Sequence, residues 1–316
     1  MSVNMRVEFC GITLPSPVIA ASGTFGFGTE YADYVCLDRI GGIALKGLTR
    51  EPRAGNAGVR IAETAGGILN CIGLENPGVD AFVEDILPAL RTQTGTPLIA
   101  NISGNTVEDY AYMAQRLQVE GIAALEVNIS CPNVRNGCLA FGVDAAIAAE
   151  VTRQVKAHAA QPVIVKLSPN VTDITVVAQA VEAAGADAIS LINTLLGMAI
   201  DAERRIPLLG NVTGGLSGPC VKPIALRLVW QVAQAVKIPI CGMGGIMTGT
   251  DAIEFMMAGA DCVSVGTATI IDPRAVERIG DEMEEWCRSH GVEDVRDLVG
   301  TLQVPQAMPT QCPTEG

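Results

Sequence analysis

The chain has 316 residues, of which 49% are hydrophobic and 17% are charged, and its formal net charge is −13. The excess of acidic residues argues against a nucleic-acid surface, because phosphate binding needs clustered cations. Since no apolar run is long enough to span a bilayer and residues 1–9 lack the apolar region of a signal peptide, we expect a cytoplasmic protein without a membrane contact.

The predicted elements begin with a short hairpin over residues 7–14, expected at the bottom of the fold. Eight continuous apolar runs follow, which is the pattern of parallel strands covered on both faces. They occupy residues 17–23, 40–47, 97–103, 124–130, 162–168, 188–194, 238–245 and 262–267. Helical patterns lie between most of them, at residues 106–119, 143–158, 173–184, 223–236, 249–258 and 273–289.

Eight strand–helix units predict an α/β protein with a (β/α)₈ TIM barrel, forming a single domain over residues 1–316. A doubly wound sheet is the alternative, which the lack of a dinucleotide fingerprint disfavours. Residues 184–191 and 258–265 repeat the same helix end, glycine and strand entry. The long connections 48–96 and 195–237 are expected over the barrel mouth. We expect the tail after about residue 304 to be poorly ordered.

A cysteine directly follows the fourth predicted strand. Residues 126–133 read Glu-Val-Asn-Ile-Ser-Cys-Pro-Asn, so Cys131 lies between the amides of Asn128 and Asn133. Chemistry in β/α proteins occurs at the carboxyl ends of strands, where a thiol suits a nucleophile or a proton acceptor. The alternative is a buried, inert cysteine, which is common.

Cysteine and histidine usage limits other chemistries. The chain has ten cysteines, none in a CxxC pair, and two histidines, His158 and His290. We therefore expect no disulfide framework, no metal site and no histidine-based triad.

The other strand ends carry groups that suit a phosphorylated, planar ligand. Glycine turns at residues 242–245 and 266–267 expose backbone N–H groups, as a phosphate site requires, although plain turns are the alternative. Lys46 and Lys166 end apolar strands and are expected to point into the mouth toward an anion, rather than to lie along the outside. Amide side chains, which suit a polar heterocycle, occur at Asn70, Asn101, Asn128, Asn133 and Asn193. FMN meets these needs, because a lysine stabilises the negative charge of its reduced ring.

These residues resemble the dihydroorotate dehydrogenase family over most of the chain, from about residue 7 to residue 304. The resemblance rests on the two glycine turns and on residues 20–23, 70–78, 128–133, 192–194 and 214–219. A cysteine at position 131 is typical of class 1, and the loop 134–142 is similar to that of type B, the catalytic subunit of an NAD-linked enzyme. The sequence departs from the family at Gly47, Cys71 and Glu75, where threonine, alanine and glutamine are usual.

The resemblance implies a role for each matching residue. FMN would be held by Ser22, Lys46, Gly47, Asn101, Asn128, Lys166, Ile192, Gly218, Gly244, Gly245, Gly266 and Thr267. Dihydroorotate would be held by Lys46, Asn70, Cys71, Ile72, Gly73, Leu74, Asn128, Asn193 and Thr194. Cys131 would be the catalytic base, and residues 134–141 would form a lid that carries it.

The implied reaction is the oxidation of (S)-dihydroorotate to orotate in de novo pyrimidine (UMP) biosynthesis, with the hydride passing to FMN N5 and the proton to Cys131. Electrons would reach NAD through a partner subunit with FAD and a [2Fe–2S] cluster, in a heterotetramer of two catalytic and two electron-transfer chains. A fumarate-dependent type 1A enzyme, another FMN-dependent barrel oxidoreductase, a phosphate-binding barrel synthase and a catalytically silent scaffold are the alternatives.

Overall fold

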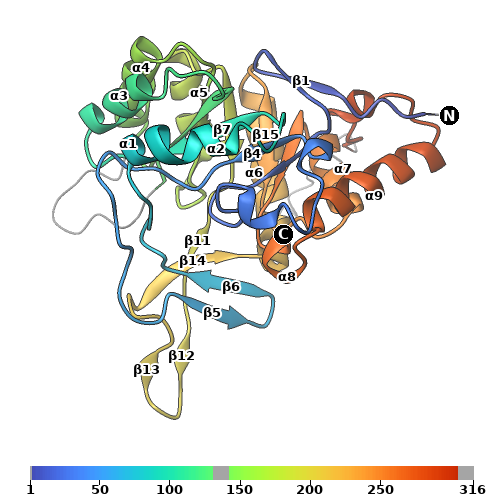
Figure 1. Cartoon of the computed structure of the whole chain (residues 1–316). Coiled ribbons are helices and arrows are strands. Elements are labelled where there is room, and N and C mark those ends of the chain that lie inside the picture. Colours follow the sequence, from blue (N-terminus) through green and yellow to red (C-terminus); the bar gives the residue numbers. More distant parts are fainter. Residues whose placement is uncertain (1, 131–141, 305–316) are drawn as a thin grey trace, which may run out of the picture.

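The computed structural model describes residues 2–130 and 142–304. Eight parallel strands close into a barrel in the order β10-β15-β16-β3-β4-β7-β8-β9 (Figure 1). Their bounds are β3 Val18–Ala20, β4 Gly42–Ala44, β7 Leu98–Ile102, β8 Ala124–Asn128, β9 Val163–Lys166, β10 Ala188–Leu191, β15 Ile240–Met243 and β16 Cys262–Val265. The barrel confirms the predicted fold class. Each strand is shorter than its apolar run, because the ends of the run continue into the connecting turns.

Helices cover the outside of the barrel. Their bounds are α1 Val79–Ala81, α2 Leu87–Leu90, α3 Val107–Arg116, α4 Ala145–His158, α5 Ile174–Ala183, α6 Lys222–Ala235, α7 Gly249–Met257, α8 Ala268–Ile271 and α9 Ala275–Ser289. A π-helical turn, η3 (Phe82–Ile86), joins α1 to α2, and short 3₁₀ turns are η1 (Thr29–Tyr31), η2 (Leu37–Arg39), η4 (Pro219–Val221) and η5 (Val295–Leu298). In the described part of the chain, no helix is both long and apolar enough to cross a membrane.

The repeat found in the sequence has a structural role at two strand entries. In each copy of the repeat, an aspartate follows the sequence Ala-Gly-Ala. Its carboxylate accepts a hydrogen bond from the backbone N–H of the first residue in the barrel strand that comes before it in the chain. Asp187 Oδ2 lies 2.7 Å from the N–H nitrogen of Val163, and Asp261 Oδ2 lies 2.7 Å from that of Ile240. The repeat therefore ties each strand to its barrel neighbour.

The N-terminal hairpin consists of β1 (Val7–Phe9) and β2 (Ile12–Leu14) and lies at the opposite end of the barrel from the inserted strands (Figure 1). The Phe9 side chain is fully buried and lines a small internal void with barrel residues that include Ile19 and Ile99. The hairpin thus fills the bottom of the barrel with apolar side chains.

Replacing Phe9 with alanine is expected to lower the free energy of unfolding by about 3–5 kcal/mol, because the change leaves a cavity in a close-packed interior. Chemical denaturation followed by circular dichroism measures this loss. Thr13, exposed on the same hairpin, provides the control, since its replacement with alanine should cost no more than about 0.5 kcal/mol. Equal stability of the Phe9→Ala variant and the native chain would contradict a packing role for the hairpin.

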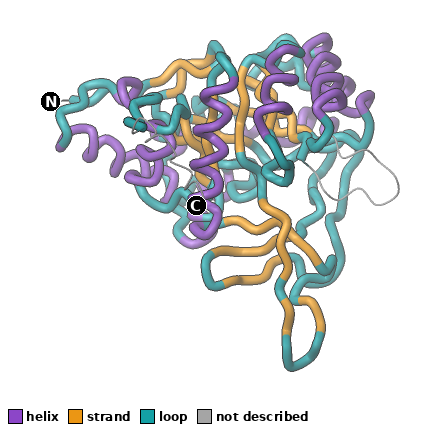
Figure 2. Tube along the Cα trace, turned by 180° about the vertical axis from the view of Figure 1, so that it is seen from behind, coloured by secondary structure: helices purple, strands orange, loops and turns teal. Residues whose placement is uncertain are grey.

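The two long connections meet in one small sheet. Strands β5 (Ile61–Thr64) and β6 (Gly67–Asn70) come from the first connection, and β11 (Leu195–Met198) and β14 (Thr213–Ser217) come from the second. They pair in the order β11-β14-β6-β5, and a further hairpin of β12 (Ile200–Asp201) and β13 (Ile206–Pro207) extends away from the barrel (Figure 2). This four-stranded sheet stands over the carboxyl ends of the barrel strands, as predicted.

Candidate active site

A cavity of about 260 Å³ lies between the barrel mouth and the four-stranded sheet. The barrel contributes polar side chains to its wall, and the first connection contributes the residues after β6. Its lining includes Ser22, Lys46, Gly47, Asn101, Asn128, Lys166, Asn193 and Thr194 from the barrel, and Asn70, Ile72, Gly73 and Leu74 from the connection. The structure therefore brings together most of the residues that the sequence predicted for cofactor and substrate.

A second, smaller cavity of about 90 Å³ adjoins the first and shares Ser22, Lys166 and Asn193 with it. Its wall includes both predicted phosphate turns, with Gly244, Gly245, Gly266 and Thr267, together with Ile192. Gly245 has a φ of 77°, and a Cβ placed there would lie 2.8 Å from Gly218 O. The turn therefore needs glycine, and its backbone is open to a ligand.

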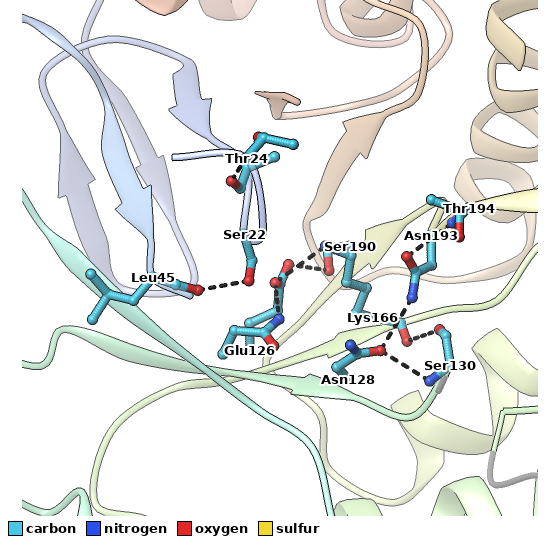
Figure 3. Close-up of polar contacts among 12 residues, drawn as sticks. Ser22, Thr24, Leu45, Glu126, Asn128, Ser130, Lys166, Ser190, Asn193 and Thr194 are labelled. Atoms are coloured by element: carbon cyan, nitrogen blue, oxygen red, sulfur yellow. Dashed lines mark hydrogen bonds and ion pairs between the residues drawn. The ribbon is translucent and has the colours of Figure 1, made fainter. Parts of the chain in front are cut away.

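Lys166 ends β9 inside the barrel and is only 5% exposed. Its Nζ lies 3.4 Å from Glu126 Oε2, and the same oxygen accepts a 2.6 Å hydrogen bond from Asn101 Nδ2. The other carboxylate oxygen of Glu126 accepts a 2.8 Å hydrogen bond from Ser190 Oγ (Figure 3). Four neighbouring strands, β7, β8, β9 and β10, thus meet at one buried carboxylate.

Glu126 was not predicted from the sequence to be a site residue. A signal was present, because Glu126 and Asn128 are two residues apart on a strand and therefore point to the same side. Since Asn128 was predicted to face the mouth, Glu126 had to face the barrel interior as well. A charged residue in an otherwise apolar strand interior needs a partner of opposite charge, and Lys166 is that partner.

Asn128 has a fixed orientation at the mouth. Its side-chain oxygen accepts hydrogen bonds from Ser130 N at 3.1 Å and from Asn193 Nδ2 at 3.3 Å (Figure 3). Its backbone carbonyl accepts a 2.8 Å hydrogen bond from the Tyr110 hydroxyl. Because the oxygen is occupied, the Asn128 Nδ2 group is the part of this amide available to donate to a ligand.

Asn101, in contrast to Asn128, presents a hydrogen-bond acceptor to the cavity. Its Nδ2 donates to Glu126 Oε2, whereas its buried Oδ1 has no hydrogen-bond partner among the described residues. A Cβ added to Gly47 would lie 3.0 Å from this oxygen, so the glycine found here leaves the amide uncovered. A buried acceptor without a partner fits a ligand that brings an N–H donor.

Several predicted residues lie elsewhere. Cys71 is buried with Leu69 and Leu209 in a small cluster on the face of the four-stranded sheet away from the cavity, because Leu69 alternates with Ile68 and Asn70, which line the cavity. Gly218 packs against Gly245 and is absent from the described linings of both cavities. Cys131, Asn133 and most of the loop 134–142 lie outside the described residues. The cavity also includes Gly23, Thr24, Glu75 and Gly215, which carried no assigned role.

Glu75, one of the departures from the family pattern, is paired with an arginine at the cavity edge. The Arg60 guanidinium donates a hydrogen bond to Glu75 and holds the pKa of its carboxyl below the usual range. Its negative charge is therefore matched locally.

The described cysteines are all free thiols. Cys241 and Cys262 lie side by side on β15 and β16 as buried residues. Burial raises the pKa of the nearby Cys10 thiol to about 12, so this group stays protonated at neutral pH. Within residues 2–130 and 142–304, no cluster of histidine, cysteine and carboxylate side chains is arranged to hold a metal ion.

A closed β/α barrel with one buried and one half-buried lysine, amide side chains and glycine turns at the carboxyl ends of its strands has the architecture of a barrel enzyme. The family model for dihydroorotate dehydrogenase matches residues 4–286. The chain belongs to the dihydroorotate dehydrogenase family, and membership of this family implies a flavin cofactor.

Curated bacterial relatives share more than half of their residues with this chain. The relative from Geobacter sulfurreducens is 58% identical over 302 residues, which cover 95% of this chain and 99% of the relative. The relative from Desulforamulus reducens is 57% identical over 305 residues, covering 96% and 100%. Each of these relatives is named dihydroorotate dehydrogenase B (NAD(+)), catalytic subunit.

Proposed function

We propose that this chain is a single FMN-binding domain that oxidises (S)-dihydroorotate to orotate in pyrimidine biosynthesis, as the catalytic subunit of an NAD-linked enzyme. The observation that carries the proposal is the cavity at the barrel mouth, where Lys46, Lys166 and several amides meet in a chain of this family. The cavity has a mostly apolar wall with a few convergent polar groups, as small-molecule sites do.

The described residues fit FMN. The open glycine turns suit its phosphate, the unpartnered Asn101 Oδ1 suits a ring N–H, and Lys166 suits the charge that a flavin gains on reduction. The residues that would hold it are those predicted from the sequence, with Ser22 and Ile192 among them. When bound there, FMN supplies a hydride acceptor.

The substrate would lie beneath the four-stranded sheet. Lys46 lines this cavity and would pair with the carboxylate of dihydroorotate, because an ammonium group offers a charge-assisted hydrogen bond. Asn70, Asn128 and Asn193 offer amide groups for the ring N–H and C=O. Together they would hold the ring in one orientation and exclude water, as the residues after β6 close the cavity.

Cys131 is the proposed base that takes the proton from C5 of the substrate. The residue before it is firmly placed, since Ser130 N donates to Asn128 Oδ1 and Ser130 Oγ donates to Lys166 O at 3.1 Å. Ser130 is thus held beside Asn128, which lines the cavity. The Cys131 thiol must ionise to act, and a free cysteine has a pKa of about 8.5.

NAD use would require an electron-transfer subunit with FAD and a [2Fe–2S] cluster, in the heterotetramer that the sequence resemblance implies. The sequence supports this division, because it has neither a dinucleotide fingerprint nor the cysteine spacing of a plant-type iron–sulfur site. The names of the curated relatives also call them catalytic subunits.

The test uses the purified chain alone under anaerobic conditions. We expect yellow protein whose flavin absorbance is bleached by dihydroorotate, with NAD turnover only after the electron-transfer subunit is added. Failure of dihydroorotate to reduce the flavin would contradict the proposed substrate. Brisk turnover with fumarate, or with NAD and no partner, would contradict the two-subunit enzyme and favour the type 1A alternative.

A further inference from the structure

Glu126 lies in the barrel interior directly below the cavity and is 4% exposed. No step of the proposed reaction requires a carboxylate at this place. We propose that Glu126 is a positioning residue, which orients the Asn101 amide toward the flavin and halves the positive charge of the site. This inference deepens the proposed function and rests on FMN being the cofactor.

Glu126 determines which end of the Asn101 amide faces the cavity. An asparagine can present either its oxygen or its NH₂ group, and only the surrounding hydrogen bonds decide. Glu126 Oε2 accepts from Asn101 Nδ2 at 2.6 Å, and a carboxylate cannot donate in return. The Oδ1 of Asn101 must therefore turn away from Glu126, which leaves it as the unpartnered acceptor described above.

Glu126 also lowers the net positive charge of the site. Among the described residues, four charged side chains lie in or below the cavity: Lys46, Lys166, Glu75 and Glu126. Glu75 is paired with Arg60 at the cavity edge. Glu126 lies 3.4 Å from Lys166 Nζ, so the two lysines and this carboxylate leave one net positive charge rather than two. Because the interior has a low dielectric, each of these charges acts strongly on the ligand.

The carboxylate is itself held in one place. Ser190 Oγ donates to Oε1 at 2.8 Å (Figure 3). Asn101 Nδ2 and Lys166 Nζ donate to Oε2. Each of its three partners is on a different barrel strand, so Glu126 cannot turn without breaking contacts across the barrel.

Replacement of Glu126 with glutamine separates these roles. The new amide oxygen can still accept from Asn101 and Lys166, and the new NH₂ group can donate to Ser190 Oγ, so the hydrogen-bond geometry is kept and only the charge is lost. We expect the midpoint potential of bound FMN to become more positive by about 30 mV or more. For a two-electron couple, this shift corresponds to about a tenfold change in the equilibrium constant for reduction. The potential is measured by reductive titration against a reference dye.

Ser190→Ala is the matched control, because it removes one hydrogen bond to the same carboxylate and keeps the charge. We expect this variant to change the two-electron equilibrium by less than about threefold. Glu126→Ala should in addition weaken FMN binding to the apoprotein by about tenfold or more relative to Glu126→Gln, since an amide without its partner loses its orientation. Fluorescence quenching of FMN measures this affinity.

An unchanged or more negative potential in Glu126→Gln would overturn the charge role, and equal FMN affinity of Glu126→Ala and Glu126→Gln would overturn the orienting role. If Glu126→Gln does not fold, the same comparison is made between Lys166→Met and the Glu126→Gln/Lys166→Met double variant. The double variant should have the more positive potential, and equal potentials would contradict the proposal. The titration uses a chemical reductant, so its outcome does not depend on dihydroorotate being the substrate.

Discussion

Replacement of Cys131 with alanine is expected to slow the reduction of the bound flavin by dihydroorotate about 10²- to 10⁴-fold at neutral pH, which is the usual effect of removing a general base. FMN content and orotate affinity should stay near those of the native chain, because the amides and lysines that hold both ligands are unchanged. Anaerobic stopped-flow absorbance measures the rate of reduction.

Cys36→Ala is the control for this experiment, since Cys36 is an exposed thiol that lies outside the described cavity lining. Its reduction rate should equal that of the native chain. The rate of the native chain should also rise with pH as the thiol ionises, whereas the slow rate of Cys131→Ala should lack this dependence. Native-like reduction in Cys131→Ala would show that another group takes the proton.

Replacement of Lys166 with methionine is expected to slow flavin reduction by about 10²- to 10³-fold, as the loss of one preorganised stabilising group does. The variant should also be less stable by about 3–5 kcal/mol, because it leaves the Glu126 carboxylate buried without its counter-charge. Stopped-flow absorbance measures the first effect and chemical denaturation of the apoprotein measures the second.

Lys156→Met is the matched control, because Lys156 forms an ion pair with Asp187 at 2.6 Å but lies on the outside of the barrel, where both side chains are about one-third exposed. Its loss should cost no more than about 1 kcal/mol and leave flavin reduction unchanged. A Lys166→Met variant with native FMN content and native reduction rate would place Lys166 outside the site.

The sequence was sufficient to predict the barrel and much of the cavity wall. Continuous apolar runs that end in polar residues specify both a parallel strand and the edge at which its last side chain appears, which is why Lys166 and Asn128 were found. Which strands lie next to each other could be predicted only once the barrel fold was assumed, and the residues that face each other on adjacent strands could not be predicted. The contact of Asn101 with Glu126, which depends on the register of β7 against β8, therefore went unnoticed.

Residues in the long connections were harder to assign. Cys71 directly follows Asn70, so alternation along the strand would have turned its side chain away from the mouth that Asn70 was predicted to face. The structure places it with Leu69 and Leu209, on the face of the sheet away from the cavity. The pairing of β6 with β14 could not be predicted from the sequence, because the alternation of apolar and polar residues in a short strand is too brief to identify its partner strand.

That pairing has a consequence for the order in which the molecule matures. Asn70 Nδ2 donates to Gly215 O at 3.3 Å, and the two residues are 145 positions apart. At about 5–20 residues per second, a ribosome needs roughly 7 to 30 seconds to make the intervening segment. During that time the hairpin of β5 and β6 has an unpaired edge, which is a site for wrong associations. A nascent chain that ends before residue 213 lacks β14, the strand that joins the two halves of the four-stranded sheet over the cavity. The cavity can therefore bind its ligands only late in synthesis.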